Sequence, residues 1–195
     1  MSTQHTDGWL IVRVREGDLD ALGELYERHK LAVYRTALAI TRDERAAEDI
    51  LQDVFLRVHA YAASIDETRP LAPWLYRVTV NLAYSWTKRV KYLLYSLHDT
   101  LDRWVSPPQH HPEAATDERE RRQGLQQAID ALPLGHRIVI VLYYLEGLSL
   151  KEIAYVMDIP EGTVKSRLHY ARESLRGTLL ERERRLVPEV AYDFT

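Results

Sequence analysis

Apolar residues recur along most of this chain at spacings of three and four, the period of an amphipathic helix and not of a strand. Two long series predict helices over residues 22–40 and 47–61, and a shorter helix is expected over residues 9–15. A third long helix is predicted over residues 73–92, because Pro73 suits the first turn of a helix and apolar residues follow it at helical spacing. Its expected apolar face consists of Leu75, Val78, Leu82 and Trp86.

The second half of the chain shows the same period after a break. Residues 106–117 hold three prolines and little apolar content, which is typical of a flexible linker. Apolar residues from 93 to 104 keep helical spacing, so this stretch either extends the preceding helix or docks elsewhere. Beyond the break, four further helices are predicted over residues 118–132, 135–146, 149–158 and 161–185.

These patterns predict an all-α protein of two small helical domains. The length of 195 residues is enough for one ordinary domain or for two small ones. We place the first domain at residues 1–95, the linker at 96–117, the second domain at 118–185 and a tail at 186–195. We expect the tail to be mobile, the alternative being that its aromatic residues dock on a partner.

Residues 149–172 predict a helix-turn-helix. Ser149 followed by Glu152 is the pattern of a capping box, which fixes the start of the first helix. Asp158 stands at the turn, and Asp is one of the few residues besides Gly that adopt the left-handed backbone found there. The second helix begins near Pro160, and its expected buried stripe consists of Val164, Leu168, Ala171 and Leu175.

The opposite face of that second helix carries groups that suit a DNA major groove. Lys165, Ser166 and His169 can donate hydrogen bonds to base edges, while Gly162 would let backbone amides approach a phosphate. Flanking arginines suit phosphates. The residues expected at DNA are Gly162, Thr163, Lys165, Ser166, Arg167, His169, Tyr170 and Arg172. The alternative interpretation is a helical hairpin that packs against another protein.

Composition excludes several other classes of function. The chain has no cysteine, which excludes disulfides, a thiol nucleophile and sulfur-based zinc sites. No histidine has the Glu-x-x-His or His-Glu-x-x-His spacing of helical metal sites, and no glycine-rich phosphate loop is present, so we expect no enzyme, metal or cofactor. The longest apolar run, residues 138–145, is far shorter than the roughly 20 residues that span a bilayer. Without a signal-peptide pattern either, a cytoplasmic protein with no membrane insertion is predicted.

Charge is unevenly distributed, although the net charge is only −3. Residues 1–68 contain 8 Lys and Arg against 13 Asp and Glu, whereas residues 69–92 contain 5 against none. This asymmetry indicates two surfaces with different partners, the basic one suited to phosphate. The helix over 44–62 presents an acidic stripe with an apolar neighbour, which suits a basic protein partner. This stripe consists of Glu48, Asp49, Gln52, Asp53 and Leu56.

The helix over 73–92 combines cations, an amide and an aromatic ring on one stripe. Tyr84 can stack on an unpaired base, Asn81 can hydrogen-bond a base edge, and the two cations, Arg77 and Lys88, can neutralise phosphates. The preceding loop, residues 64–73, contains two prolines and lacks periodicity. It adds the polar residues Asp66, Glu67, Thr68 and Arg69.

Three strings, in this order, resemble the extracytoplasmic-function (ECF) subgroup of bacterial RNA polymerase sigma factors. Residues 47–57 (AEDILQDVFLR) are similar to the helix that grips the polymerase clamp, and residues 73–83 (PWLYRVTVNLA) to the helix after it. Residues 162–167 (GTVKSR) are similar to the promoter-reading helix of the family's last domain. The resemblance covers about residues 10–182, which is nearly the whole chain.

The resemblance implies a sigma factor without enzymatic activity. Its first domain would bind core RNA polymerase at the clamp and open the −10 promoter element, and its second would read the −35 element. The polymerase flap would be a further contact. The loop over 65–69 would capture a base flipped from the melted strand, with Asn81 lining the pocket. An anti-sigma factor and a role in stress responses are also implied.

Two other functions remain open at this point. A stand-alone helix-turn-helix regulator would share residues 149–172 but would not explain the acidic stripe or the aromatic and basic stripe. A sigma-like protein that only binds a regulator would have the same sequence features as an active one.

Overall fold

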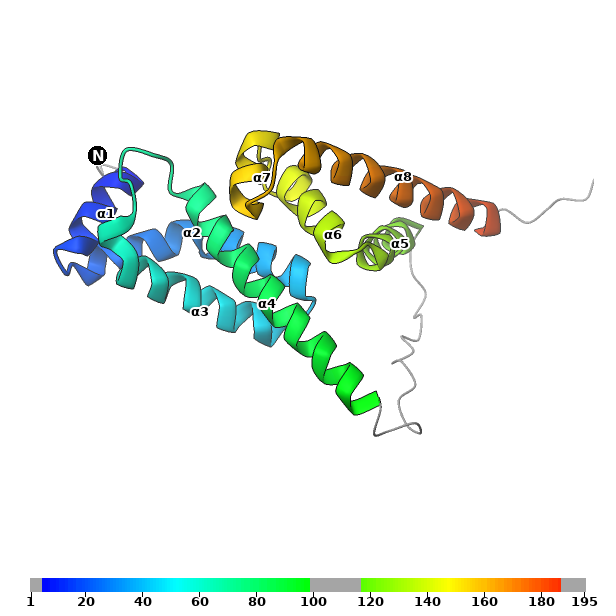
Figure 1. Cartoon of the computed structure of the whole chain (residues 1–195), viewed down its shortest axis with the longest axis horizontal. Coiled ribbons are helices and arrows are strands. Elements are labelled where there is room, and N and C mark those ends of the chain that lie inside the picture. Colours follow the sequence, from blue (N-terminus) through cyan, green and yellow to red (C-terminus); the bar gives the residue numbers. More distant parts are fainter. Residues whose placement is uncertain (1–4, 99–116, 187–195) are drawn as a thin grey trace, which may run out of the picture.

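The computed structural model describes residues 5–98 and 117–186, and these residues form helices and turns without strands (Figure 1). This confirms the all-α prediction. The first group of helices consists of α1 (Asp7–Arg15), α2 (Leu19–Thr41), α3 (Glu44–Tyr61), the 3-10 turn η1 (Ala62–Ser64) and α4 (Ala72–His98). The second group consists of α5 (Asp117–Ala131), α6 (Leu134–Ile140), the π-helical turn η2 (Val141–Leu145), α7 (Leu150–Met157) and α8 (Glu161–Leu186). Most of the predicted linker and tail lies outside the described residues.

Helices α2, α3 and α4 pack together, and α1 lies across one end of them (Figure 1). Local sequence explains where two of them begin. Asp18 caps α2 by accepting hydrogen bonds from the backbone amides of Asp20 and Ala21, and Asp43 caps α3 by accepting one from Ala46. Acidic caps of this kind satisfy amides that have no partner in the first helical turn.

Helix α4 is longer than predicted and buries a different face. It continues to His98, so the apolar residues beyond position 92 extend it. Of the predicted apolar face, Leu75 is buried, whereas Val78, Leu82 and Trp86 are only partly buried. The prediction failed because α4 packs on α2 and α3 and also on α7, so its apolar residues do not form one stripe. Its buried residues are Leu75, Tyr76, Thr79, Val80 and Ala83.

The second group of helices contains the predicted helix-turn-helix, formed by α7 and α8. The capping box is present, because the Ser149 side chain accepts from the amide of Glu152 while the Glu152 carboxylate accepts from the amide of Ser149. Asp158 adopts the left-handed backbone, with φ 54° and ψ 49°, and so ends α7. The buried stripe of α8 is Val164, Leu168 and Ala171, with Leu175 partly buried beside it.

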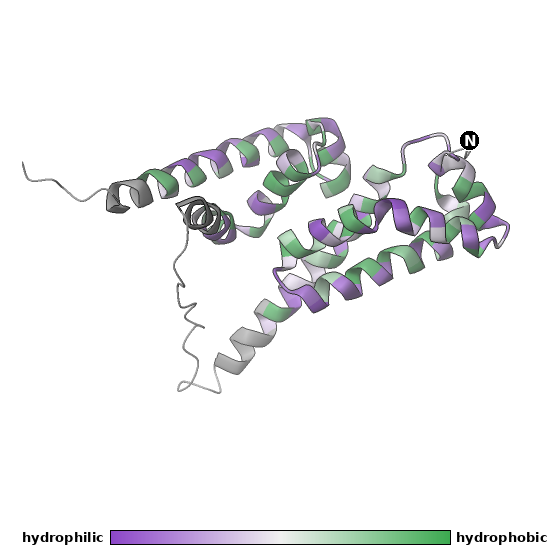
Figure 2. Cartoon of the chain, turned by 180° about the vertical axis from the view of Figure 1, so that it is seen from behind, coloured by the Kyte–Doolittle hydropathy of each residue, from purple (hydrophilic) through white to green (hydrophobic). Residues whose placement is uncertain are grey.

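The two groups of helices contact each other. Helix α4 packs beside α7, and α2 packs beside η2 and α6 (Figure 1). Their buried residues form one continuous hydrophobic cluster, and hydrophobic and hydrophilic residues alternate around most of the helices (Figure 2). Within the described residues, no helix is both long and apolar enough to cross a membrane.

Candidate polymerase and nucleic-acid interface

The acidic stripe of α3 faces away from the helix bundle. Ile50, Val54 and Phe55 bury the inner face of α3, and this leaves the opposite face in solvent. Leu56, which belongs to this stripe, has 64% of its surface exposed. Among the described residues, the carboxylates of the stripe have no ion-pair partner. The exposed residues of the stripe are Glu48, Asp49, Gln52, Asp53 and Leu56.

The loop between η1 and α4 is shaped by its own polar residues. The Asp66 carboxylate accepts hydrogen bonds from the amide of Thr68 at 3.0 Å and from its hydroxyl at 2.6 Å. Arg15 of α1 donates to the Glu67 carboxylate at 2.7 Å. Hydrogen bonds from Thr68 lower the pKa of Asp66, and the bond from Arg15 lowers the pKa of Glu67, so both carboxylates are ionised at neutral pH.

The predicted stripe on α4 divides into two parts. Arg77 contacts α7, because it donates to the Tyr155 carbonyl at 3.1 Å, lies 5.0 Å from the centre of the Tyr155 ring and pairs with Asp158 at 3.6 Å. Arg69 of the preceding loop lies 5.9 Å from the centre of the same ring. In this arrangement α7 therefore covers one end of the surface expected to bind DNA.

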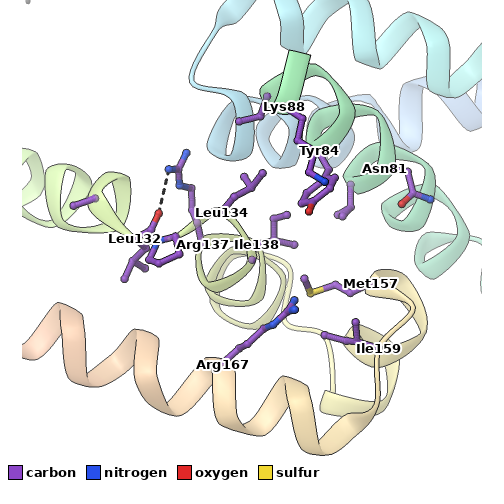
Figure 3. A pocket seen from close by; sticks show the side chains of 15 residues that line it. Asn81, Tyr84, Lys88, Leu132, Leu134, Arg137, Ile138, Met157, Ile159 and Arg167 are labelled. Carbon is purple, nitrogen blue, oxygen red and sulfur yellow. Dashed lines mark hydrogen bonds between the residues drawn. The ribbon is translucent and has the colours of Figure 1, made fainter. Parts of the chain in front are cut away.

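The other part of the α4 stripe lines a cavity of about 910 Å³ between α4 and the second group of helices (Figure 3). Asn81, Tyr84 and Lys88 line it from the side of α4. The Lys88 ammonium lies 4.7 Å from the centre of the Tyr84 ring. A cation and an aromatic ring are therefore adjacent, which suits the phosphate and the base of an unpaired nucleotide. The opposite wall includes Leu134, Arg137, Ile138, Met157, Ile159 and Arg167.

The predicted DNA-facing stripe of α8 is exposed. Gly162, Lys165, Ser166, His169 and Tyr170 all lie in solvent, and Tyr170 has 62% of its surface exposed. This stripe therefore projects from the helix-turn-helix with polar groups outward, the arrangement a helix needs to enter a major groove.

The two predicted phosphate-binding arginines of α8 point elsewhere. Arg167 is partly buried and points into the cavity beside α4 (Figure 3). Arg172 donates to the Tyr144 hydroxyl at 2.8 Å and lies over the rings of Tyr143 and Tyr144. Thr163, also in the predicted set, is partly buried in the first turn of α8.

A buried carboxylate joins the two groups of helices, and the sequence analysis did not single it out. The Glu146 side chain, just after η2, has 0% of its surface exposed. Arg35 of α2 donates to both carboxylate oxygens, at 2.9 and 2.8 Å, and the Tyr76 hydroxyl of α4 donates to one of them at 2.6 Å. The Thr36 hydroxyl lies 2.9 Å from the other oxygen. We call this arrangement the Glu146 latch.

The partners of Glu146 keep it charged despite its burial. Burial alone would raise the pKa of Glu146, but the hydrogen bonds from Arg35, Tyr76 and Thr36 outweigh this effect and hold the pKa below its usual value. Burial and the bond to the carboxylate raise the pKa of the Tyr76 hydroxyl, so it stays protonated and donates. A lone carboxylate next to Gly147 was visible in the sequence, but its partners lie 70 and 110 residues away.

A further set of contacts between the two groups involves arginines. Arg137 of α6 donates to the Ile40 carbonyl at 3.1 Å, and Arg42 pairs with Asp130 at 2.9 Å. Within the described part of the chain, no cluster of His, Asp or Glu residues could hold a metal ion.

Comparisons with known proteins identify the two groups of helices. Residues 25–91 match the family model for sigma-70 region 2, and residues 122–175 match that for sigma-70 region 4. The ECF RNA polymerase sigma factor SigW of Bacillus subtilis is 34% identical over 176 residues, which is 87% of this chain and 94% of SigW. The chain belongs to the ECF RNA polymerase sigma factors.

Other members of the family align over similar lengths. SigL of Mycobacterium tuberculosis is 35% identical over 158 residues, covering 80% of this chain and 88% of SigL. The chain is therefore a promoter-directing sigma factor that binds RNA polymerase and DNA, and the stand-alone regulator is not favoured. Sigma factors are initiation factors without catalytic activity of their own, consistent with a protein that is not an enzyme.

Solved structures of other proteins share the fold of this ECF sigma factor. CnrH, solved in complex with the cytosolic domain of CnrY, matches with a TM-score of 0.66 at 24% identity over 89% of this chain and 96% of that one. The sigma factor RpoE, solved in complex with the anti-sigma factor NepR from Bartonella quintana, matches with a TM-score of 0.59 at 24% identity over 77% and 91%. At this identity the likeness concerns the fold.

Proposed function

We propose that this sigma factor binds core RNA polymerase through the acidic stripe of α3, the −10 element through the loop over 65–69 and α4, and the −35 element through α8. The observation that carries the proposal is the division of α8 into two faces. Val164 and Leu168 are buried against the domain, while Lys165 and His169 are exposed on a face that no other described helix covers. Exposed donors on the second helix of a helix-turn-helix suit base edges in a major groove.

We propose the same domain limits as the sequence suggests: residues 1–95, a linker over 96–117, residues 118–185 and a tail over 186–195. The second domain offers polymerase a further contact, an apolar groove of about 590 Å³ between α5, η2 and α8 that suits the flap. Its lining includes Leu125, Ile129, Tyr144, Leu175, Leu179 and Leu180. Because polymerase and promoters are its partners, the protein acts in the bacterial cytoplasm.

Promoter binding requires the two groups of helices to separate. The names of the two elements place them about 25 base pairs apart, which is roughly 85 Å of B-form DNA at 34 Å per ten base pairs. In the structure Arg77, on the surface proposed for the −10 element, pairs at 3.6 Å with Asp158 at the turn of the helix-turn-helix. We therefore assign this closed form, in which the two groups of helices are in contact, to the sigma factor before it engages a promoter. Binding of polymerase would favour an open form, in which the two groups are apart.

An anti-sigma factor is a further proposed partner. Both solved structures named above are complexes with a second protein, and in one of them the sigma factor RpoE is bound to NepR, which is described as an anti-sigma factor. The cavity between α4 and α6–α8 combines apolar side chains with the cations Lys88, Arg137 and Arg167. Such a lining suits an amphipathic helix that presents apolar and acidic residues, in the way helices bind hydrophobic grooves. In that role the anti-sigma factor would block the −10 surface and stabilise the closed form.

The proposed function is tested by transcription in vitro. Purified protein is mixed with core polymerase that lacks sigma factors and with a library of genomic promoter fragments, and transcript starts are sequenced. Starts that depend on this chain and share paired upstream elements are expected. Absence of such starts from every fragment, together with absence of core binding, would contradict the proposal.

Two double variants test the separate surfaces. Lys165→Ala with His169→Ala should weaken recognition of the −35 element and leave core binding intact. Asp49→Ala with Gln52→Ala should weaken core binding instead. If both double variants lost both activities equally, the assignment of separate surfaces would be wrong.

A further inference from the structure

The loop that carries the proposed base-capturing residues has little support from the hydrophobic core. Its ends are fixed by Ile65 and Leu71, which are both buried. The five residues between them, 66–70, are all exposed. A loop with so few buried contacts samples many shapes unless other groups hold it, and ordering it on binding would weaken the capture of a base.

Arg15, the last residue of α1, supplies this support through its guanidinium group. Its Nε donates to the Ala62 carbonyl at 2.8 Å. One terminal nitrogen donates both to the Ile65 carbonyl and to the Glu67 carboxylate, the latter at 2.7 Å. One planar side chain therefore connects three points of the segment over 62–67, and a lysine ammonium could not reproduce this geometry.

Helix α1, which carries Arg15, is itself fixed to the rest of the domain. Asp7 in the first turn of α1 accepts from Arg28 at 3.0 Å and pairs with His29 at 2.7 Å, and both partners belong to α2. Leu10, Ile11 and Val14 bury the inner face of α1.

Gly8 provides a second contact between α1 and the loop. A Cβ atom at this position would lie 2.1 Å from the Glu67 carbonyl oxygen, which is far inside van der Waals contact. The backbone of the loop therefore rests directly on the first turn of α1, while Arg15 holds the loop from the last turn.

We propose that Arg15 is a positioning residue for −10 recognition, with the loop over 65–69 as the element that it positions. This inference rests on the proposed function of that loop. Because Arg15 holds Glu67 and Thr68 holds Asp66, both carboxylates set the shape of the loop before DNA arrives. The ligand is an unpaired base of the melted promoter strand, and its discrimination from other bases depends on this shape.

The test compares Arg15→Met with Arg13→Met, which removes an arginine of the same helix whose hydrogen bonds, among the described residues, go to Glu16 and Asp18 and not to the loop. Holoenzyme is assembled with each variant, and initiation is measured on one promoter with each base in turn at every position of the −10 and −35 elements. Arg15→Met should reduce discrimination at one −10 position about tenfold, with −35 discrimination and core affinity unchanged. Arg15→Lys should give an intermediate loss, and Arg13→Met should match the wild type.

An unchanged −10 base profile for a folded Arg15→Met variant would overturn the inference. An equal loss of −10 discrimination, −35 discrimination and core binding would also overturn it, because that pattern marks a general loss of structure. If circular dichroism shows that Arg15→Met does not fold, the same −10 base profile is measured for Gly8→Ala, because this change displaces the loop and keeps Arg15. Reduced discrimination at the same position would then support the inference, and an unchanged profile would overturn it. Failure of the wild type to initiate anywhere would instead overturn the proposed function, on which this inference depends.

Discussion

Replacement of Glu146 by glutamine should open the closed arrangement of the sigma factor. Arg35 donates to both oxygens of the Glu146 carboxylate. Glutamine has the same shape, but one of the two positions then holds an amide nitrogen, which is a donor. Whichever way the amide is turned, its nitrogen faces an N–H group of Arg35, and the charge that attracts the guanidinium is gone.

The size of the effect follows from the contacts of the latch. Hydrogen bonds to a charged group contribute about 1.5–3 kcal/mol each. The Arg35 side chain is 43% exposed, so solvent screens its share, whereas the Tyr76 hydroxyl is shielded and contributes more. We take the net loss for Glu146→Gln as about 2 kcal/mol, which raises the ratio of open to closed molecules about thirtyfold.

The absence of native cysteine makes this change easy to measure. Cysteines introduced at Ala60 of α3 and Glu173 of α8, both exposed, would carry a donor and an acceptor dye. Energy transfer should be lower for Glu146→Gln than for the parent protein. Glu27→Gln is the control, since Glu27 is exposed and pairs with its neighbour Lys30.

If the Glu146→Gln protein kept both the helical content and the dye distance of the parent protein, the reasoning would be refuted. The latch would then not determine the closed arrangement.

Three further predictions concern stability. Acid should open the parent protein, because the folded pKa of Glu146 is lowered. The latch therefore contributes fully to stability above the ordinary glutamate value of 4.5, and this contribution is lost as pH falls through the lower folded pKa. The Glu146→Gln protein should lack this step when the dye distance is followed against pH, and identical titrations of the two proteins would contradict the assignment. Ser149→Ala should lower the free energy of unfolding by about 1 kcal/mol through loss of the capping box, with the exposed Ser85→Ala as the control in thermal melts, and an equal effect of the two changes would count against the cap. Leu25→Ala should lower the free energy of unfolding, measured in urea, by about 2–5 kcal/mol, because Leu25 is fully buried. Leu31→Ala, at an exposed position of the same helix, should lower it far less. Similar losses for the two variants would show that Leu25 is not a core residue.

Much of the fold follows from local features of the sequence. Hydrophobic spacing gave the helices, Ser149 and Glu152 gave the start of α7, and Asp158 gave its end. The division of α8 into a buried and an exposed face also follows from spacing alone, since 3.6 residues per turn place Val164, Leu168 and Ala171 on one side. These features depend on residues within a few positions of each other, so one sequence is enough to predict them.

The buried face of α4 could not be predicted in the same way. Spacing indicated Leu75, Val78, Leu82 and Trp86, but packing on both α2 and α7 selects a different set. The orientation of Arg167, expected at DNA and found facing the cavity beside α4, also depends on how the two groups of helices meet.

By itself, the sequence determined the all-α fold, the helix-turn-helix and the acidic, aromatic and basic stripes on which the proposed surfaces rest. The tertiary structure decided what joins these parts: Glu146 with Arg35 and Tyr76, and Arg15 with the loop that follows η1. The physical reason is distance along the chain. A cap or an amphipathic stripe is encoded by neighbours, whereas an ion pair to a buried carboxylate from a residue 111 positions away exists only once the core has brought the partners together.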